Sequence, residues 1–313
     1  MIILKALITG ASGFVGGFLT EFLIGKGLDV LGISRSEGFL NKEKNIKYRC
    51  DILNADGLEN ILQSFQPDYI IHLAAPAFIP TSLKLPKQTY DLVFLGTLNL
   101  LECVRKLELN TKILYVSSAD VYGNSLNPVL SELDSCKPIN PYSSAKACAE
   151  LMCQQYFHSY GIDVVIARPF NHTGPYQSPD FVCSDFAYQI ASMTENSEKK
   201  IFTGNIEVKR DFMDVRDVVD AYYKLLTYGQ SGEIYNVSSG RASSIREIIT
   251  MLFNHAGITK YEIVTDPQKV RSNDVPIRIG DRTKIFQHTG WKPVYVLNET
   301  IEDLYRYWKE QLH

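Results

Sequence analysis

The sequence predicts an α/β protein whose parallel sheet is covered by helices on both faces. Short apolar runs alternate with amphipathic stretches from the first residue onward, which is the pattern of strands and helices in such a sheet. A glycine-rich turn follows the first apolar run. After residue 170 the alternation loosens, and loops rich in Gly, Pro, Asn and Asp appear. We therefore expect a doubly wound sheet followed by a smaller α/β lobe that is discontinuous in the chain.

Seven apolar runs predict the strands of the main sheet. They cover residues 3–10, 29–35, 47–52, 67–75, 112–118, 163–169 and 231–239. Helical periodicity predicts helices over 14–27, 89–107 and 217–228, and another around Tyr142 and Lys146. The chain then divides into a main domain of residues 1–170 plus 217–240 and a smaller lobe of residues 171–216 plus 241–313.

Composition excludes several classes of protein. A net charge of −3 over 313 residues gives no electrostatic basis for binding nucleic acid or an anionic membrane. No apolar run approaches the length of a membrane span. The six cysteines are scattered, with no CxxC pair and no clustering with histidine. We expect reduced thiols in a cytoplasmic protein, and no metal site.

The turn after the first strand predicts a dinucleotide site. In "TGASGFVG", Gly10, Gly13 and Gly16 lie between a strand and a helix, where glycine lets the backbone approach a pyrophosphate at the helix N-terminus. The spacing is GxxGxxG, which differs from the more common GxGxxG, and a tight strand–helix turn is the alternative interpretation. The position directly after the first strand favours a Rossmann-type dinucleotide-binding domain.

The end of the second strand indicates which dinucleotide is preferred. An acidic residue there holds the ribose hydroxyls of NAD, whereas an arginine accommodates the 2′-phosphate of NADP. The stretch "GISRSE" offers Ser34 and Arg35, with no carboxylate until Glu37. We expect NADP(H), with NAD(H) as the alternative if Arg35 is only a solvated side chain. Asp51, after the third strand, could accept a hydrogen bond from the adenine amino group, although a surface aspartate fits the spacing nearly as well.

The stretch "PINPYSSAKACAE" places Tyr142 and Lys146 four residues apart on a helix, so that the two side chains share a face. One interpretation is a half-buried tyrosine beside a solvated lysine. The other is that the ammonium lowers the pKa of the phenol and makes it a usable acid at neutral pH.

Three motifs in order, TGxxGFVG, the serine of "VSSADVYG", and YxxxK, resemble the extended short-chain dehydrogenase/reductase family of nucleotide-sugar enzymes along essentially the whole chain. Within that family, "FNHTGPYQSPDFVCSDFA", "GNIEVKRDF" and "VRSNDVPIRIGD" are most similar to the branch of GDP-mannose 4,6-dehydratases and GDP-4-keto-6-deoxy-D-mannose reductases, and nearest to its reductases.

The resemblance implies a role for each matching residue. Tyr142 would be the general acid, Lys146 its partner on the nicotinamide ribose, and Ser118 the group that hydrogen-bonds the reacting sugar oxygen. The implied substrate contacts are Asn171, Arg210, Arg271 and Asp274. The implied cofactor contacts, besides Tyr142 and Lys146, are Gly10, Ser12, Gly13, Phe14, Val15, Ser34, Arg35, Asp51, Ile52, Leu73, Ala74, Ala75 and His172. His72, in contrast, lies in a buried strand, and we interpret it as a hydrogen-bonded core histidine.

The residues after Ser118 bear on the type of reaction. Eliminating water from a sugar needs a base and an acid, and Ala119 can be neither. Asp120 is a candidate acid/base group or a loop carboxylate. Ketone reduction needs only NADPH, Tyr142 and Ser118, so we expect reduction of a GDP-linked 4-keto-6-deoxy sugar of the mannose type. A GDP-mannose 4,6-dehydratase, a nucleotide-sugar 4-epimerase and a non-catalytic dinucleotide sensor are the alternatives.

Two helical stretches also predict a homodimer. "LVFLGTLNLLECVRKL" and "AKACAELMCQQYF" are apolar on more than one face. Two subunits could pair these helices in an isologous four-helix interface, as the family's dimers do. The alternative is that the second apolar face packs on the small lobe.

Overall fold

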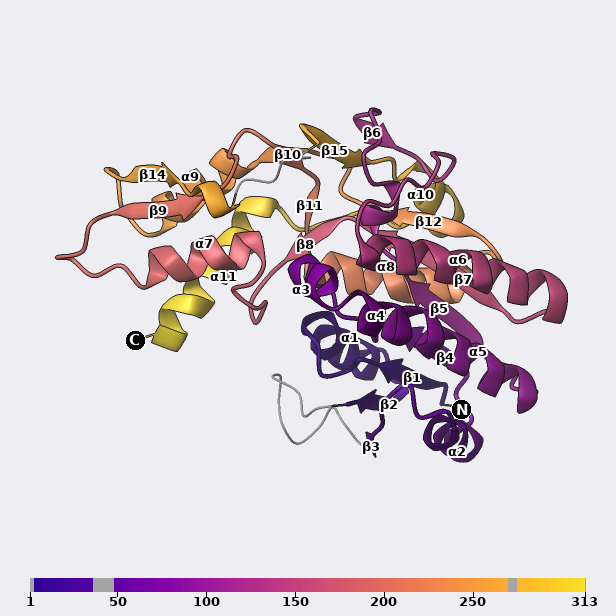
Figure 1. Ribbon diagram of the computed structural model, residues 1–313. Coiled ribbons are helices and arrows are strands. Elements are labelled where there is room, and N and C mark those ends of the chain that lie inside the picture. Colours follow the sequence, from indigo (N-terminus) through magenta and orange to yellow (C-terminus); the bar gives the residue numbers. More distant parts are fainter. Residues whose placement is uncertain (1–2, 36–47, 270–274, 313) are drawn as a thin grey trace.

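The computed structural model describes residues 3–35, 48–269 and 275–312 and contains a parallel sheet of seven strands (Figure 1). The strands are β1 (Lys5–Thr9), β2 (Asp29–Ser34), β3 (Tyr48–Arg49), β4 (Tyr69–His72), β5 (Lys112–Val116), β7 (Val164–Pro169) and β12 (Ile234–Val237). Their order is β12-β7-β5-β4-β1-β2-β3. The winding direction changes between β1 and β4, and in doubly wound sheets the ligand binds at the carboxyl ends of the strands beside this point.

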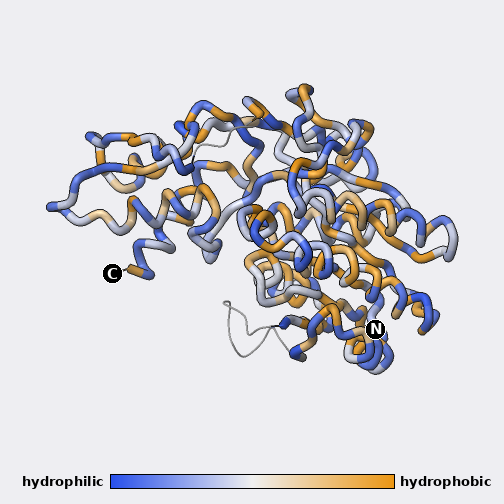
Figure 2. The backbone as a smooth tube through the Cα atoms, in the orientation of Figure 1, coloured by the Kyte–Doolittle hydropathy of each residue, from blue (hydrophilic) through white to orange (hydrophobic). Residues whose placement is uncertain are grey.

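Helices cover both faces of this sheet, as the sequence predicts. Alternate strand residues enter two separate cores, since Ile8 and Leu114 point to one face and Leu7 and Ile113 to the other. The first core is closed by α1 (Phe14–Gly25) and α8 (Val215–Tyr228), and the second by α2 (Ala55–Phe65), α5 (Gly96–Lys106) and α6 (Pro141–Tyr160). In Figure 2 the apolar segments gather in these strands and helices.

The helix expected over residues 89–107 forms, with one irregular turn inside it. After α3 (Ile79–Lys84), the chain forms α4 (Pro86–Tyr90), one π-helical turn (Asp91–Leu95) and then α5. The wide turn ends at Gly96, where a Cβ atom would lie 2.8 Å from the Cγ2 atom of Ile52. The expected helical stretch is therefore confirmed apart from this irregular turn, which ends where Gly96 meets Ile52, three residues after β3.

The remaining strands form smaller sheets away from the seven-stranded one. One sheet has the order β13-β10-β15-β6, another pairs β11 with β8, and a third pairs β14 with β9. Their bounds are β6 (Val129–Leu130), β8 (Asn171–Thr173), β9 (Lys200–Thr203), β10 (Lys209–Arg210), β11 (Phe212–Asp214), β13 (Ser243–Ser244), β14 (Glu262–Thr265) and β15 (Ile277–Gly280).

Three helices pack beside β9 and β14, at the left of Figure 1: α7 (Val182–Ala191), α9 (Ile245–His255) and α11 (Leu297–Leu312). They enclose a third apolar core with residues such as Phe186, Ile248 and Leu304. This part of the molecule therefore has a core of its own.

The chain returns to the large sheet near its end. Helix α10 (Thr283–Thr289) packs against α8 and β12. Ile285 and Trp291 lie in the first core, and the indole Nε1 of Trp291 donates a hydrogen bond to the carbonyl of Asp217 at 3.2 Å. Ile285 and Trp291 fall in the range 241–313, which we assigned to the smaller lobe, yet they complete the core of the main domain. The exact division into two domains stays a prediction. Among the described residues, no helix has the length and apolar character needed to cross a membrane.

Candidate active site

The glycine loop lies between β1 and α1, at the switch point of the sheet. Gly10 has φ +72°, a backbone conformation that residues with a side chain rarely adopt. A Cβ there would lie 2.9 Å from the backbone nitrogen of Ala74. At Gly16 a Cβ would lie 2.7 Å from Ala11. Gly13 is the N-cap of α1 and has no side chain to cap the helix. The amides at the start of α1, from Phe14 and Val15, therefore face the loop without a side-chain cap, as an anion-binding turn requires.

His172 lies over the start of this helix. Its ring stacks on that of Phe14, with centroids 6.3 Å apart and planes 10° apart. Its Nδ1 lies 2.9 Å from the carbonyl oxygen of Phe170, which can only accept, so Nδ1 carries the proton. Burial lowers the pKa of His172, which favours the neutral ring. The structure thus brings together two residues, 158 positions apart, that we expected at the cofactor.

The carboxyl end of β2 is polar and carries the expected arginine. The hydroxyls of Ser34 and Ser12 lie 2.5 Å apart, which joins the strand end to the glycine loop. Arg35 is exposed. Its carbonyl accepts a hydrogen bond from Nε of Arg49 at 3.0 Å, so a second guanidinium, which the sequence analysis did not single out, lies at the same edge.

The ends of β3 and β4 continue this edge. The carboxylate of Asp51 accepts a hydrogen bond from the amide of Leu53 at 3.0 Å, and Ile52 is buried against Gly96. Leu73, Ala74 and Ala75 follow β4, and the amide of Ala74 donates to the hydroxyl of Thr9 at 3.2 Å.

His72 belongs to the protein core. Its Nδ1 lies 2.7 Å from the hydroxyl of Thr9, and its Nε2 lies 3.1 Å from that of Thr97. Burial, and secondly the charge of Lys146, lower its pKa to about 3. The interpretation of a hydrogen-bonded core histidine is confirmed.

Helix α6 positions Tyr142 and Lys146. Its N-terminus is fixed by a capping box, in which the side chain of Asn140 accepts from the amide of Ser143 at 2.8 Å and the Ser143 side chain lies against the Asn140 amide. Pro141 occupies the first turn, as is common at helix starts. Tyr142 therefore lies in the first turn and Lys146 in the second, and both are buried.

The pKa of Tyr142 is raised, mainly by burial and also by the negative charge of Asp120, whereas a hydrogen bond with Ser118 lowers it. One of the two interpretations of the sequence was that the ammonium of Lys146 lowers this pKa, but the net shift is upward and Lys146 is not among its causes. The phenol is buried, and the Nζ atom of Lys146 donates instead to the carbonyl of Val116 at 2.6 Å. Burial thus favours the neutral phenol of Tyr142.

Lys146 is itself a perturbed group. Burial lowers its pKa to about 8, against the opposing charge of Glu150 on the next turn. Its ammonium also lies 5.0 Å from the centre of the Tyr115 ring, a favourable cation–π distance.

Asp120 makes an ion pair that the sequence did not predict. Its Oδ1 accepts a hydrogen bond from Nη1 of Arg278 at 2.7 Å. Asp120 lies in the short 3₁₀ turn Ala119–Tyr122, and its amide donates to the hydroxyl of Ser118, the N-cap of that turn, at 3.1 Å. The stretch "PIRIGD" contained Arg278, but 158 positions separate the two partners, and no local signal linked them.

The expected substrate residues are only partly described. Asn171 begins β8 and is exposed, paired in register with Phe212 of β11. Arg210 lies in β10, and its Nη1 donates to the carbonyls of Lys209 and Val275 at 2.9 and 2.7 Å. Arg271 and Asp274 lie outside the described residues.

The chain also matches a known protein family. The model of the family described as GDP-mannose 4,6 dehydratase matches residues 7–304. The chain belongs to this family. It is 35% identical to the GDP-6-deoxy-D-mannose reductase of Pseudomonas aeruginosa over 98% of both chains. It is 32% identical to the GDP-6-deoxy-D-talose 4-dehydrogenase of Aggregatibacter actinomycetemcomitans over 92% of both chains.

A solved structure of a relative has the same fold. The structure of RMD from Pseudomonas aeruginosa complexed with NADPH superposes with a TM-score of 0.88, at 34% sequence identity, and covers 98% of this chain and 99% of the other. The relatives of this chain thus include a GDP-6-deoxy-D-mannose reductase and a protein whose structure was solved with NADPH.

The residues of this family member fit a bound dinucleotide. The glycine turn has no room for a side chain at Gly10, because a Cβ would lie 2.9 Å from the Ala74 nitrogen. The N-terminus of α1 has no acidic residue in its first turn, and the ammonium of Lys146 lies at the carboxyl end of β5, on the same edge of the sheet as the glycine loop. In the described part of the chain, no group of three or more His, Cys, Asp or Glu side chains could hold a metal ion.

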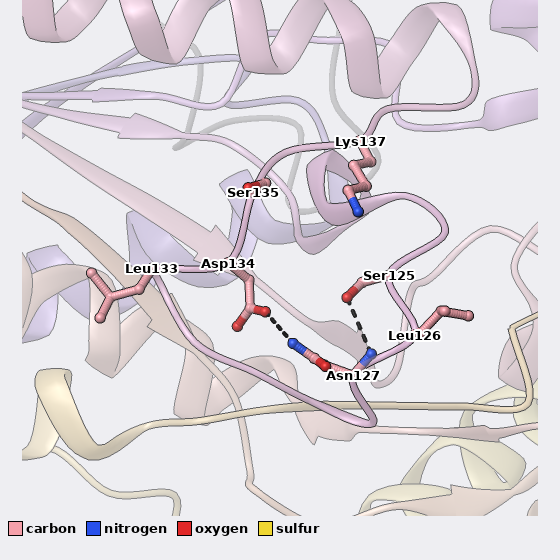
Figure 3. A pocket seen from close by; sticks show the side chains of 7 residues that line it. All are labelled: Ser125, Leu126, Asn127, Leu133, Asp134, Ser135 and Lys137. Atoms are coloured by element: carbon pink, nitrogen blue, oxygen red, sulfur yellow. Dashed lines mark hydrogen bonds between the residues drawn. The ribbon is translucent and has the colours of Figure 1, made fainter.

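A separate surface pocket lies on the loop between the 3₁₀ turn and α6 (Figure 3). Asn127 Nδ2 donates to Asp134 Oδ1 across it at 2.6 Å, and its lining contains none of the residues that we expected at the site. The leucines at its rim, Leu126 and Leu133, are almost fully exposed.

Proposed function

We propose that this protein is an NADPH-dependent reductase of the C4 ketone of a GDP-linked 4-keto-6-deoxy sugar of the mannose type. The product is a GDP-D-rhamnose-type sugar or its C4 epimer. Such a sugar would serve as a precursor in glycan or polysaccharide synthesis. The similarity to a GDP-6-deoxy-D-mannose reductase over the full length supports the substrate class.

One feature of the site supports Tyr142 as the proton donor. Tyr142 is buried, and its pKa is raised by that burial and by Asp120, so the phenol is protonated at neutral pH. Reduction requires a protonated acid beside the carbonyl oxygen, because the oxygen becomes an alkoxide as hydride arrives.

Each residue of the centre then has a role. Bound NADPH supplies the hydride. The hydroxyl of Tyr142 gives its proton to the C4 oxygen, the hydroxyl of Ser118 holds that oxygen in place, and the ammonium of Lys146 binds the nicotinamide ribose. The glycine loop holds the pyrophosphate, and Arg35 binds the 2′-phosphate at the exposed end of β2.

Dehydration is less well supported. Elimination needs an acid and a base next to the serine, but Ala119 has no ionisable group, and Asp120 is engaged by Arg278 at 2.7 Å. A carboxylate held in this way is poorly placed to shuttle protons.

The substrate side of the site is proposed from the smaller sheets. Asn171 would contact the diphosphate, with Arg210 and Arg271 as its cationic partners and Asp274 on the ribose. These residues belong to the proposed nucleotide-sugar lobe, residues 171–216 plus 241–313, next to a cofactor domain of residues 1–170 plus 217–240. We also propose that the enzyme is a cytoplasmic homodimer.

The deciding experiment supplies the ketone directly. A GDP-mannose dehydratase generates GDP-4-keto-6-deoxymannose, this protein and NADPH are added, and NMR identifies the product. The expected result is NADPH oxidation with a new GDP-6-deoxyhexose. If only a dTDP- or UDP-linked ketone were reduced, the GDP assignment would fall. If GDP-mannose itself were converted without the added dehydratase, the enzyme would be a dehydratase.

A further inference from the structure

Arg278 reaches from the smaller four-stranded sheet to the turn that carries the catalytic serine. Its Nη1 donates to the carboxylate of Asp120 at 2.7 Å, and its Nη2 donates to the carbonyl of Gly123 at 2.8 Å. The two bonds hold both ends of the turn Ala119–Tyr122. A planar guanidinium suits this arrangement, because its nitrogens point to two acceptors at fixed spacing.

The pair is partly buried, since the side chain of Arg278 is 11% exposed and that of Asp120 is 30% exposed. Charge-assisted hydrogen bonds of this length are stronger than bonds between neutral groups. Removing the arginine would leave a partly buried carboxylate without its counter-charge. The pair therefore fixes where the carboxylate of Asp120 lies.

Asp120 lies beside two residues of the proposed catalytic centre. It follows Ser118 by two residues, its amide bonds the Ser118 hydroxyl, and its charge acts on the phenol of Tyr142. The substrate proposed above has an acidic C–H bond at C5, beside the C4 ketone. A free carboxylate at this position could remove that proton and form an enolate, whose oxygen would lie beside Tyr142 and Ser118.

We infer that Arg278 determines reaction specificity by holding Asp120 out of use as a base at C5, so that the ketone is reduced without exchange or loss at that carbon. Arg278 is in this sense a positioning residue. It acts through Asp120 and needs no contact with the sugar. The inference rests on the proposed function, because it concerns the same ketone.

The atoms balance in the reaction that Arg278 suppresses. The Asp120 carboxylate takes the C5 proton, the C5–H electron pair becomes the C4–C5 double bond of the enolate, and the charge moves to the C4 oxygen. In D₂O the carboxylic acid exchanges its proton for a deuteron and returns the deuteron to C5. The ketone is regenerated, nothing is oxidised or reduced, and deuterium at C5 records the event.

The test is deuterium incorporation at C5 of the ketone, followed by NMR in D₂O with NADP⁺ in place of NADPH. We expect Arg278→Leu to raise the exchange rate roughly 10²-fold over the wild type, the lower end of what a positioned base supplies. The double variant Arg278→Leu/Asp120→Asn should return to the wild-type rate. Arg278→Lys, which keeps the charge, should restore most of the suppression.

A matched control is Arg246→Leu, which removes another arginine from an ion pair in the smaller part of the molecule, with Glu207. It should leave exchange at the wild-type rate. Melting temperature and NADPH affinity verify that each variant folds. If Arg278→Leu did not fold, Arg278→Gln, which keeps one donor but loses the charge, would take its place with an intermediate rise expected.

The outcomes separate the two proposals. If the wild type does not reduce the ketone with NADPH, the proposed function falls and the inference with it. If the wild type reduces the ketone but the folded variants show no added exchange, only the role of Arg278 is refuted. Rapid exchange in the wild type, or exchange that persists in the double variant, would equally refute it.

Discussion

The ammonium of Lys146 lies 2.6 Å from the carbonyl oxygen of Val116, the last residue of β5, and is buried there together with the phenol of Tyr142. The lysine is thus anchored to the sheet through a backbone acceptor, one helical turn from the tyrosine. Its location predicts how the reaction depends on pH.

Reduction should lose activity above about pH 8. Burial lowers the pKa of Lys146 to about 8 from 10.5, so the ammonium is present below that pH and is lost above it. The pKa of Tyr142 is raised and does not titrate in this window. The measurement is kcat/KM for the ketone between pH 6 and pH 10. The variant Lys146→Arg keeps its charge at these pH values, so its residual kcat/KM should no longer fall at alkaline pH. If the fall persisted unchanged in this variant, a group other than Lys146 would cause it.

Tyr142→Phe should separate chemistry from binding. The substitution removes only a hydroxyl, so the buried ring still packs and NADPH affinity should persist. Turnover should fall by roughly 10²–10⁴, the range for losing a positioned acid. Ketone reduction and NADPH fluorescence titration measure the two effects. Near-normal reduction by the variant would contradict the mechanism.

Arg35→Asp should weaken NADPH binding and favour NADH. A carboxylate at this exposed strand end repels the 2′-phosphate and can accept from the ribose hydroxyls. The bond from Arg49 ends on the backbone carbonyl of Arg35, so the strand pairing should survive the substitution. Dissociation constants for both dinucleotides measure the switch. Lys292→Asp, at an exposed position after α10, makes the same charge change and should leave their ratio unaltered.

The protein should become less stable in mild acid because of His72. Its pKa is about 3 in the folded state and 6.5 in the unfolded state, so below pH 6.5 only the unfolded chain binds the proton. This single group should lower the free energy of unfolding by about 2 kcal/mol between pH 7 and pH 5. Urea unfolding at both pH values measures it. In His72→Gln the difference between the two pH values should shrink by that amount.

Leu151→Asp should dissociate the proposed dimer. Leu151 on α6 is 68% exposed, and Leu95, in the π-helical turn that packs against α6, is 43% exposed. We propose that a second subunit covers these two leucines. At micromolar concentration, light scattering should give twice the chain's 35.4 kDa for the wild type and the mass of one chain for the variant. Leu126→Asp, on the loop of Figure 3, should remain dimeric; a monomeric wild type would refute the interface.

Sequence periodicity was sufficient for the large sheet but not for the contacts between distant segments. Strand and helix positions follow from local patterns, and Gly10, Tyr142 and Lys146 carry motif spacings that can be read along the chain. The Asp120–Arg278 pair depends on how β15 is placed against the turn after β5, which no local pattern encodes. The raised pKa of Tyr142 depends on burial from several elements, and the π-helical turn before Gly96 depends on contact with Ile52.

The return of the chain at Ile285 and Trp291 affects how specificity can be engineered or evolve. Strand β12 and helix α10 complete the large sheet and its first core, and β13, β14 and β15 of the smaller sheets lie between them in the chain. A transplant of the sugar-binding part from a relative would therefore need several junctions, each ending where a segment re-enters that core. A chain cut after residue 170 would lack β12 and Trp291. One edge of β7 would then be unpaired, and the space in the first core that the Trp291 indole fills would be empty. New sugar preferences should arise by substitutions within this chain more readily than by exchange of a whole terminal segment.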